Sequence, residues 1–345
     1  MDWLRNCWQV AAYAGELGGS LLPRTFLGEN VILFRDIDGT AHALVDRCAH
    51  RCVPLSRGKL VAGTVQCGYH GMRFNPDGTC AGVPGQDTIP VRAVVEAFPV
   101  VERHGFVWIW MGATALADPD TIPDAIWFAN PAWATATGYH HIAADYRLLV
   151  DNLLDLSHET FVHADTIGNG AVADSPVTAA IVEGNVKVHR YMANTPPPPF
   201  YTQTTGFTQN IDRWHTTYYD PPGYVLIENG SMAAGEDIAR AKQRRVVNFV
   251  TPETATSSHY FWGVARQWEP ANTELTELIR KDVVRTFDQD KALLEAQQRV
   301  LDSDPALQGF PVSIKVDAGP ILGRRLLAQR IAEQTSLSHP VMEPV

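Results

Sequence analysis

Cys48–Arg51 (Cys-Ala-His-Arg) and Cys67–Gly71 (Cys-Gly-Tyr-His-Gly) carry the most specific signal in this sequence. Together they give the pattern Cys-x-His-x16-Cys-x-x-His. Each half places a thiol and an imidazole a few residues apart, and Gly68 and Gly71 let the second half turn tightly. The spacing therefore predicts two loop tips that hold one metal centre with two sulfur and two nitrogen donors.

This donor set is that of a Rieske [2Fe–2S] cluster, in which two thiolates bind one iron and two imidazoles bind the other. The predicted cluster ligands are Cys48, His50, Cys67 and His70. Imidazole ligands raise the reduction potential above that of an all-cysteine cluster. The pattern therefore predicts a centre that accepts electrons readily and passes them on.

A structural zinc site is the competing interpretation, because zinc takes mixed Cys and His tetrahedra. Its ligands would be Cys48, Cys52, Cys67 and His70. That choice leaves His50 without a role. The corresponding function would be a zinc-stabilised binding module, which is colourless, whereas a Rieske protein is red-brown.

A second motif, Asp151–His163, contains two histidines five residues apart, His158 and His163. With a distant carboxylate they would form the two-histidine, one-carboxylate site of non-haem Fe(II) oxygenases. Five residues of ideal helix turn through about 500°, which points the two rings about 140° apart. The helix must therefore end, or loosen to a π-type turn, between the two histidines. Two ordinary packed or surface histidines are the alternative.

Two polar residues upstream complete this motif. Asp155 lies three residues before His158, on the same face of a helix. Its carboxylate is expected to accept the ring N–H of His158 that faces away from the metal. Asn152, one turn earlier, is a candidate polar group near the iron, and a capping or surface role for it remains open.

The third iron ligand is predicted from helical periodicity in the segment 281–297. An apolar stripe at spacings of three and four consists of Val283, Phe287, Asp290, Leu294, Gln297 and Leu301. Asp290 interrupts it, and a carboxylate in a buried face is costly unless it is paired or bound to a metal. We expect Asp290 to bind the iron, with a buried salt bridge to an arginine as the alternative.

Composition restricts the partners. The chain has 345 residues and a formal net charge of −10, without a run of lysine and arginine, which argues against nucleic acid. No apolar run is long enough to span a bilayer, and no basic and apolar signal segment is visible. The five cysteines do not indicate a disulfide framework. We expect a cytoplasmic protein without a membrane partner.

The chain divides into two blocks. Residues 1–111 show short β-rich segments broken by turns, which predicts a small all-β Rieske domain. Residues 112–124 form the expected linker. Residues 125–345 combine a helix near 146–163, long strands between 177 and 265, and a helix over 274–301. The predicted fold class is α+β, with a curved antiparallel sheet wrapped around the long helix in a helix-grip-like catalytic domain.

The cluster stretches and the 151–163 motif resemble the Rieske non-haem iron oxygenases, over nearly the whole chain. The resemblance is closest to the branch of vanillate O-demethylase, dicamba monooxygenase and toluenesulfonate methyl-monooxygenase. It implies that Asp290 matches the metal-binding aspartate of the family. It also implies a homotrimer, in which Asp155 links His158 to His70 of the neighbouring subunit.

Two cofactors, a Rieske [2Fe–2S] cluster and mononuclear Fe(II), predict a terminal monooxygenase. It would use O2 to hydroxylate or oxidatively demethylate a small aromatic or cyclic substrate. No flavin site, nicotinamide Gly-x-Gly-x-x-Gly fingerprint or four-cysteine cluster is visible, so a separate NAD(P)H-dependent reductase or ferredoxin must supply the electrons. A Rieske electron-transfer protein without oxygenase chemistry is the alternative.

The substrate pocket is expected between the curved sheet and the long helix, mostly apolar with a few polar anchors. Candidate wall residues are Asn248, Trp262 and Glu228, each with an equally good structural role. Four other residues are expected to have ordinary packing or surface roles: Trp127, Trp133, His215 and His259.

Overall fold

The structure, a computed structural model, describes residues 3–307 and 312–338. The chain separates into two compact units. One comprises Arg5–Asp124 and Thr251–Ala255, and the other Met1–Leu4, Ala125–Val250 and Thr256–Val345. Residues 112–124, expected as a linker, belong to the first unit. The predicted domain limits themselves stay a prediction.

The inclusion of residues 251–255 in the first unit has a clear cause in hydrogen bonding. Leu27 donates its backbone N–H to the carbonyl of Pro252 at 3.0 Å, and Gly28 to that of Glu253 at 2.8 Å. Thr251 Oγ1 donates to the carbonyl of Val10 at 2.7 Å. These bonds add a distant hairpin tip to the N-terminal unit, a pairing that local sequence patterns cannot predict.

The N-terminal unit is all-β, as predicted. Its sheets have the orders β1-β11-β10, β2-β3-β4-β9 and β5-β6-β7-β8. The strands are β1 Trp8–Tyr13, β2 Leu22–Phe26, β3 Glu29–Arg35, β4 Ala41–Val45, β5 Lys59–Val61, β6 Thr64–Gln66, β7 Arg73–Phe74, β8 Cys80–Gly82, β9 Ala97–Phe98, β10 Val100–Arg103 and β11 Phe106–Trp110. Every residue of β11 is buried, which fits its apolar sequence. The two predicted cluster loops follow β4 and β6.

The second unit is built on one seven-stranded sheet of order β12-β18-β17-β16-β15-β14-β13. Its strands are β12 Ala134–Ile142, β13 Val177–Val182, β14 Asn185–Thr195, β15 Ile211–Asp220, β16 Tyr224–Ala233, β17 Lys242–Thr254 and β18 Ser257–Arg266. Its helices are α1 Tyr146–Leu154, α2 Glu159–Val162, α3 Gly170–Asp174, α4 Pro199–Thr205, α5 Thr273–Ser303 and α6 Ala318–Ser338. The predicted α+β class is confirmed.

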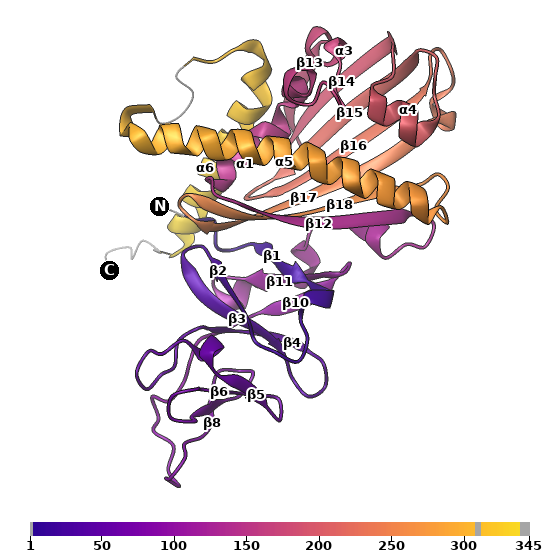
Figure 1. Cartoon of the computed structure of the whole chain (residues 1–345). Helices are drawn as coiled ribbons and strands as arrows, with labels where there is room; N and C mark the ends of the chain where they lie inside the picture. The colour runs from indigo at the N-terminus through magenta and orange to yellow at the C-terminus, as the bar shows by residue number, and fades with distance from the viewer. Residues whose placement is uncertain (1–2, 308–311, 339–345) are drawn as a thin grey trace. The chain divides into compact units, whose positions relative to one another are not determined.

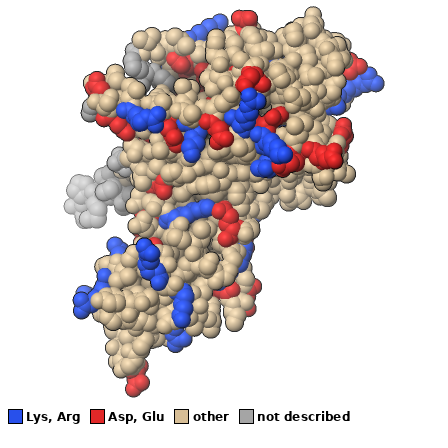
Figure 2. All heavy atoms as spheres, in the orientation of Figure 1, with Lys and Arg blue, Asp and Glu red and all other residues tan. Residues whose placement is uncertain are grey.

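Helix α5 lies along one face of this sheet (Figure 1), as expected for a sheet wrapped around a long helix. Its buried residues are Leu275, Ile279, Thr286, Asp290, Leu294 and Gln298. Leu275 and Ile279 share a core cluster with Phe200 of α4 and Val264 of β18. Basic and acidic side chains mix along the outer surface of α5 (Figure 2). Within the described residues, no helix is both long and apolar enough to cross a bilayer.

The segment expected as one helix over 146–163 is interrupted. Helix α1 ends at Leu154, and Asp155 is extended, with φ −117° and ψ 91°. A short 3₁₀ turn over Leu156–His158 then leads into α2, which His163 terminates. A regular helix does not carry both histidines, as predicted, but the chain breaks before His158 rather than only after it.

Candidate metal centres and substrate pocket

The two predicted cluster loops share one backbone conformation. Cys48 N–H donates to the carbonyl of Val53 at 2.9 Å, and Cys67 N–H donates to that of Met72 at 2.8 Å. Four residues after each cysteine, a backbone N–H donates back to the cysteine carbonyl, from Cys52 at 3.0 Å and from Gly71 at 3.1 Å. Two equivalent loops therefore present their ligands as a pair.

The backbone conformation of Cys52 explains the role of this cysteine, which lies outside the predicted set of cluster ligands. Its φ is 56°, and the equivalent Gly71 has a φ of 73°, so both occupy the left-handed region that closes the loop. The Cys52 side chain is exposed, whereas those of Cys48 and Cys67 are buried. Cys52 therefore has the position of a turn residue rather than of a metal ligand.

The four predicted ligands form an inner and an outer pair. Burial raises the pKa of the Cys48 thiol, which lies next to Cys67. His50 and His70 are exposed, with ring centroids 4.8 Å apart. Buried sulfurs and surface imidazoles suit a Rieske cluster, whose imidazole side would then be accessible for electron transfer.

A single zinc ion fits this arrangement poorly. A Zn–S distance of about 2.3 Å places tetrahedral donors about 3.8 Å apart. Within the described part of the chain, three metal-binding side chains with donor atoms all within 4.8 Å occur elsewhere, at His158, His163 and Asp290. Among the described residues, the cysteines and histidines of the N-terminal loops do not form such a group, which a two-iron cluster does not need.

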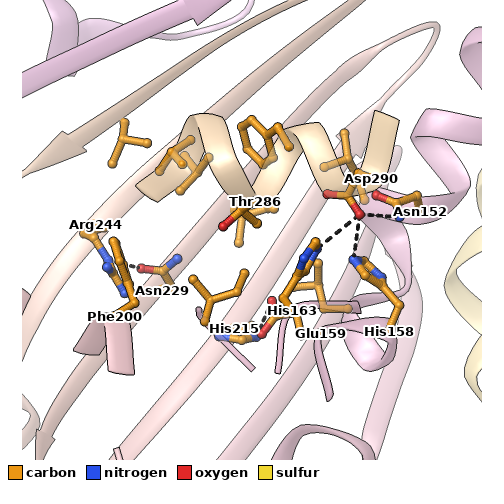
Figure 3. A pocket seen from close by; sticks show the side chains of 18 of the residues that line it. Asn152, His158, Glu159, His163, Phe200, His215, Asn229, Arg244, Thr286 and Asp290 are labelled. Atoms are coloured by element: carbon orange, nitrogen blue, oxygen red, sulfur yellow. Dashed lines mark hydrogen bonds and ion pairs between the residues drawn. The ribbon is translucent and has the colours of Figure 1, made fainter. Parts of the chain in front are cut away.

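The second centre joins the 151–163 motif to α5 (Figure 3). Asp290 Oδ1 lies 3.1 Å from His163 Nε2 and 3.4 Å from His158 Nε2. It also accepts a 3.1 Å hydrogen bond from Asn152 Nδ2. Within the described residues, Asp290 has no arginine partner, which removes the buried salt bridge that was its alternative role.

The other ring nitrogens of both histidines are hydrogen-bonded. His163 Nδ1–H donates to Gln289 Oε1 at 2.8 Å, and His158 Nδ1–H donates to the main-chain carbonyl of Asp155. Each bond leaves the Nε2 atom as the lone-pair nitrogen. Two lone pairs that face one buried carboxylate oxygen repel it unless a cation lies between them. The donor chemistry therefore fits a divalent metal held by two histidines and one carboxylate.

Electrostatics at this centre point the same way. Burial lowers the pKa of His163, but its interactions with the Asp290 carboxylate, 3.1 Å away, outweigh this and leave the pKa raised. Burial lowers the pKa of His158, which lies farther from Asp290. Glu159, which follows His158, is buried, and burial raises its pKa to about 7. Asp290 is thus the centre's main source of negative charge.

Asp155 contacts His158 differently from the expectation. Its main-chain carbonyl accepts from the ring, while its carboxylate oxygen Oδ1 accepts from Ser157 N–H at 2.9 Å. The expectation assumed a continuous helix, but α1 ends one residue before Asp155. The half-buried carboxylate therefore caps the 3₁₀ turn that carries His158.

A pocket with about 710 Å³ of space, part of it open to solvent, adjoins the three metal-binding side chains. Apolar side chains form most of its wall, among them Ile167, Phe200, Ile227, Val246, Val264 and Phe287. Arg244, Asn229 and Phe200 lie at the end opposite His158 and Asp290 (Figure 3). This volume and lining are typical of a site for a small organic molecule.

The three predicted wall residues do not line this pocket. Glu228 lies between the pocket-lining Ile227 and Asn229, so strand alternation directs it to the opposite face, where it pairs with Arg245 Nε at 2.8 Å. Asn248 is fully buried and accepts from the Tyr260 hydroxyl at 2.6 Å. Trp262 donates to His140 Nδ1 at 2.9 Å and packs against Phe287.

Several polar residues that line the pocket were not predicted from the sequence. These are Asn229 and Arg244, together with Glu159, His215 and Thr286. The adjacent arginines 244 and 245 offered a signal, because strand alternation directs one of them toward the core.

His215, which was expected to have an ordinary role, is buried with its Nδ1 3.7 Å from Glu159 Oε1. His259 meets the Tyr139 hydroxyl at 2.8 Å, and the half-buried Trp127 and Trp133 flank Arg245.

Comparisons with known proteins agree with both centres. The Rieske [2Fe-2S] domain family matches residues 7–99, and the vanillate O-demethylase oxygenase C-terminal domain family matches residues 142–333. A putative toluene-4-sulfonate monooxygenase system iron-sulfur subunit from Comamonas testosteroni is 39% identical, covering 98% of this chain and 99% of its own. A vanillate O-demethylase oxygenase subunit from Pseudomonas sp. strain HR199 is 38% identical, covering 96% and 95%.

A solved structure extends the similarity to the whole fold. Dicamba monooxygenase bound to 3,6-dichlorosalicylic acid matches with a TM-score of 0.93 and 31% identity, over 97% of this chain and 100% of that one. The cofactors are accordingly a Rieske [2Fe–2S] cluster and a mononuclear non-haem iron. The chain belongs to the Rieske non-haem iron oxygenases, as the oxygenase component of a multicomponent aromatic demethylase or monooxygenase system.

Proposed function

We propose that this oxygenase inserts one atom of O2 into a C–H bond of a small aromatic compound, by hydroxylation or by oxidative demethylation of a methoxy group. The observation that carries the proposal is the position of His158, His163 and Asp290 at one end of an apolar pocket. Relatives are named for vanillate O-demethylation and for toluene-4-sulfonate monooxygenation, which supports a methyl-bearing aromatic substrate.

The balance of the reaction defines what the chain must receive. One oxygen atom enters the C–H bond and the other leaves as water, which consumes two electrons and two protons. When the C–H bond belongs to a methoxy group, the hydroxylated product breaks down to a phenol and formaldehyde. Bound iron would supply O2 activation and the cluster would supply electrons singly.

The residues of the chain then have separate tasks. His158, His163 and Asp290 would hold the iron at one end of the pocket, next to the space for the substrate. Asn152 holds Asp290 Oδ1 by its amide, and the apolar walls exclude water from the reacting centre. Cys48, His50, Cys67 and His70 would hold the cluster.

Electrons would enter from a separate NAD(P)H-dependent reductase or ferredoxin. The surface position of His50 and His70 supports entry through the imidazole side of the cluster. We further propose a cytoplasmic homotrimer, in which Asp155 bridges His158 and His70 of the neighbouring subunit. The main-chain carbonyl of Asp155 accepts from the His158 ring while its carboxylate is only half-buried, which supports this role.

Two measurements test the proposal. Purified protein should show the visible absorption of a Rieske cluster and contain iron beyond that bound with sulfide. Reconstituted with a reductase, it should consume O2 in step with product over a panel of methoxylated and methylated aromatics. A protein that accepts electrons but gives no product with any member would be an electron carrier instead.

A further inference from the structure

An excess of buried positive charge acts on His215, which lines the pocket. Arg190, Arg213 and Arg244 are all at most 4% exposed. Within the described residues, none of the three forms an ion pair with a carboxylate; their hydrogen bonds go to neutral oxygens. The buried Glu159 acts on both Arg190 and Arg244, but burial raises its pKa to about 7; the half-buried Asp155 acts on Arg190.

Arg244 differs from the other two because it lines the pocket. Its Nε donates to Asn229 Oδ1 at 2.9 Å, which holds the guanidinium in place. Its Nη1 is buried and has no hydrogen-bond partner. The rings of Phe200 and Tyr201 lie 4.5 and 4.6 Å from its central carbon, so aromatic faces fix the plane of the group.

A buried cation with an unused donor is costly unless an anion meets it. The group stands at the end of the pocket opposite His158 and Asp290 (Figure 3). We propose that Arg244 binds an anionic substituent of the aromatic substrate, a carboxylate or a sulfonate, and so turns the opposite edge of the ring toward the iron ligands. This rests on the proposed function and names its substrate class.

The guanidinium is suited to this task. Its planar donors match the oxygens of a carboxylate or sulfonate, and the low-polarity walls strengthen the attraction. Arg245, its neighbour on β17, points to the other face of the sheet and is paired with Glu228. Arg245 therefore provides a matched control with the same residue type on the same strand.

The test is equilibrium binding, by calorimetry without a reductase, of three non-reacting probes to the metal-loaded protein: benzoate, benzenesulfonate and benzamide. The wild type should bind at least one of the anions about tenfold or more tightly than benzamide. Arg244→Met should weaken the binding of that anion about thirtyfold or more and leave the affinity for benzamide unchanged. Arg244→Lys should keep part of the preference, and Arg245→Met should behave like wild type.

Several results would overturn the inference. The first is that the wild type binds benzamide as tightly as both anions, and the second is that it binds neither anion. The third is that Arg244→Met and Arg245→Met lose anion affinity to the same extent. The wild-type comparison needs no variant, so misfolding of Arg244→Met leaves the test intact. Iron content and O2 uptake on the same samples separate the two proposals. Turnover without anion preference refutes only the role of Arg244, and anion binding without turnover refutes only the proposed reaction.

Discussion

The ring of His163 is oriented by Gln289, whose Oε1 accepts the Nδ1–H bond at 2.8 Å. Gln289 is itself held, because its Nε2 donates to Asp165 Oδ1 at 3.3 Å. Asp165 in turn pairs with Arg285. This series of interactions fixes the Gln289 amide so that its oxygen faces the ring. It leaves His163 Nε2 free to bind the metal.

We therefore expect Gln289→Leu to weaken iron binding about 10- to 100-fold, the usual cost of losing a partner of a metal-bound imidazole. A chelator competition that follows iron without sulfide measures this directly. Gln297→Leu, on the exposed side of the same helix, is the control. Wild-type affinity in Gln289→Leu would mean that the metal centre does not depend on this bond.

Asp155→Asn should leave both metal sites occupied but slow electron transfer between them. Asparagine keeps the cap on Ser157 N–H, so the turn that carries His158 should persist. It cannot keep a charge-assisted bond to a histidine of the neighbouring subunit, and such bonds are about twice as strong as neutral ones. Turnover should fall about tenfold or more, with the cluster still reducible.

Rapid mixing of the reduced protein with substrate and O2 follows reoxidation of the cluster and tests this prediction. Reoxidation at the wild-type rate would leave Asp155 with its capping role alone. Loss of iron from the variant would instead make it part of the metal site's own structure.

Asn248→Ala should act on stability rather than on substrate. The amide is fully buried, donates to the carbonyl of Val225 at 3.0 Å and accepts from the Tyr260 hydroxyl. Its removal leaves buried groups without partners, which costs about 1–3 kcal/mol. Denaturant unfolding should show that loss while KM stays near the wild-type value. A changed KM with unchanged stability would return Asn248 to the substrate site.

Features that depend on residues close together in the sequence could be predicted from it, and features that depend on distant residues could not. The cluster loops and the stripe that contains Asp290 depend on the spacing of residues within short segments, which can be read directly from the sequence. The buried face of α5 includes Thr286 and Gln298, while Gln297 on the expected stripe is exposed. Helical periodicity thus located Asp290 correctly but placed the edge of the buried face one residue away.

The pocket wall could not be predicted in the same way. Which face of a strand lines a cavity depends on the register of the whole sheet, and an error of one residue exchanges the two faces. Glu228 was chosen where Asn229 lines the pocket, which is such an error. The contact of the Asp155 carboxylate with Ser157 N–H was not predicted either, because the helix that would have aligned Asp155 with His158 ends at Leu154.

One chain holds two separate metal centres, and paired variants test this when iron, acid-labile sulfide and the visible spectrum are measured on the same samples. Asp290→Ala should lose the iron not bound with sulfide and all turnover while it keeps the cluster spectrum. His70→Ala should lose the cluster spectrum and keep its fold. Asp288→Ala, on the same helix with a side chain 61% exposed, should match wild type in iron and sulfide. Wild-type iron content in Asp290→Ala, or an intact Rieske spectrum in His70→Ala, would contradict the assignment of these residues to two separate metal centres.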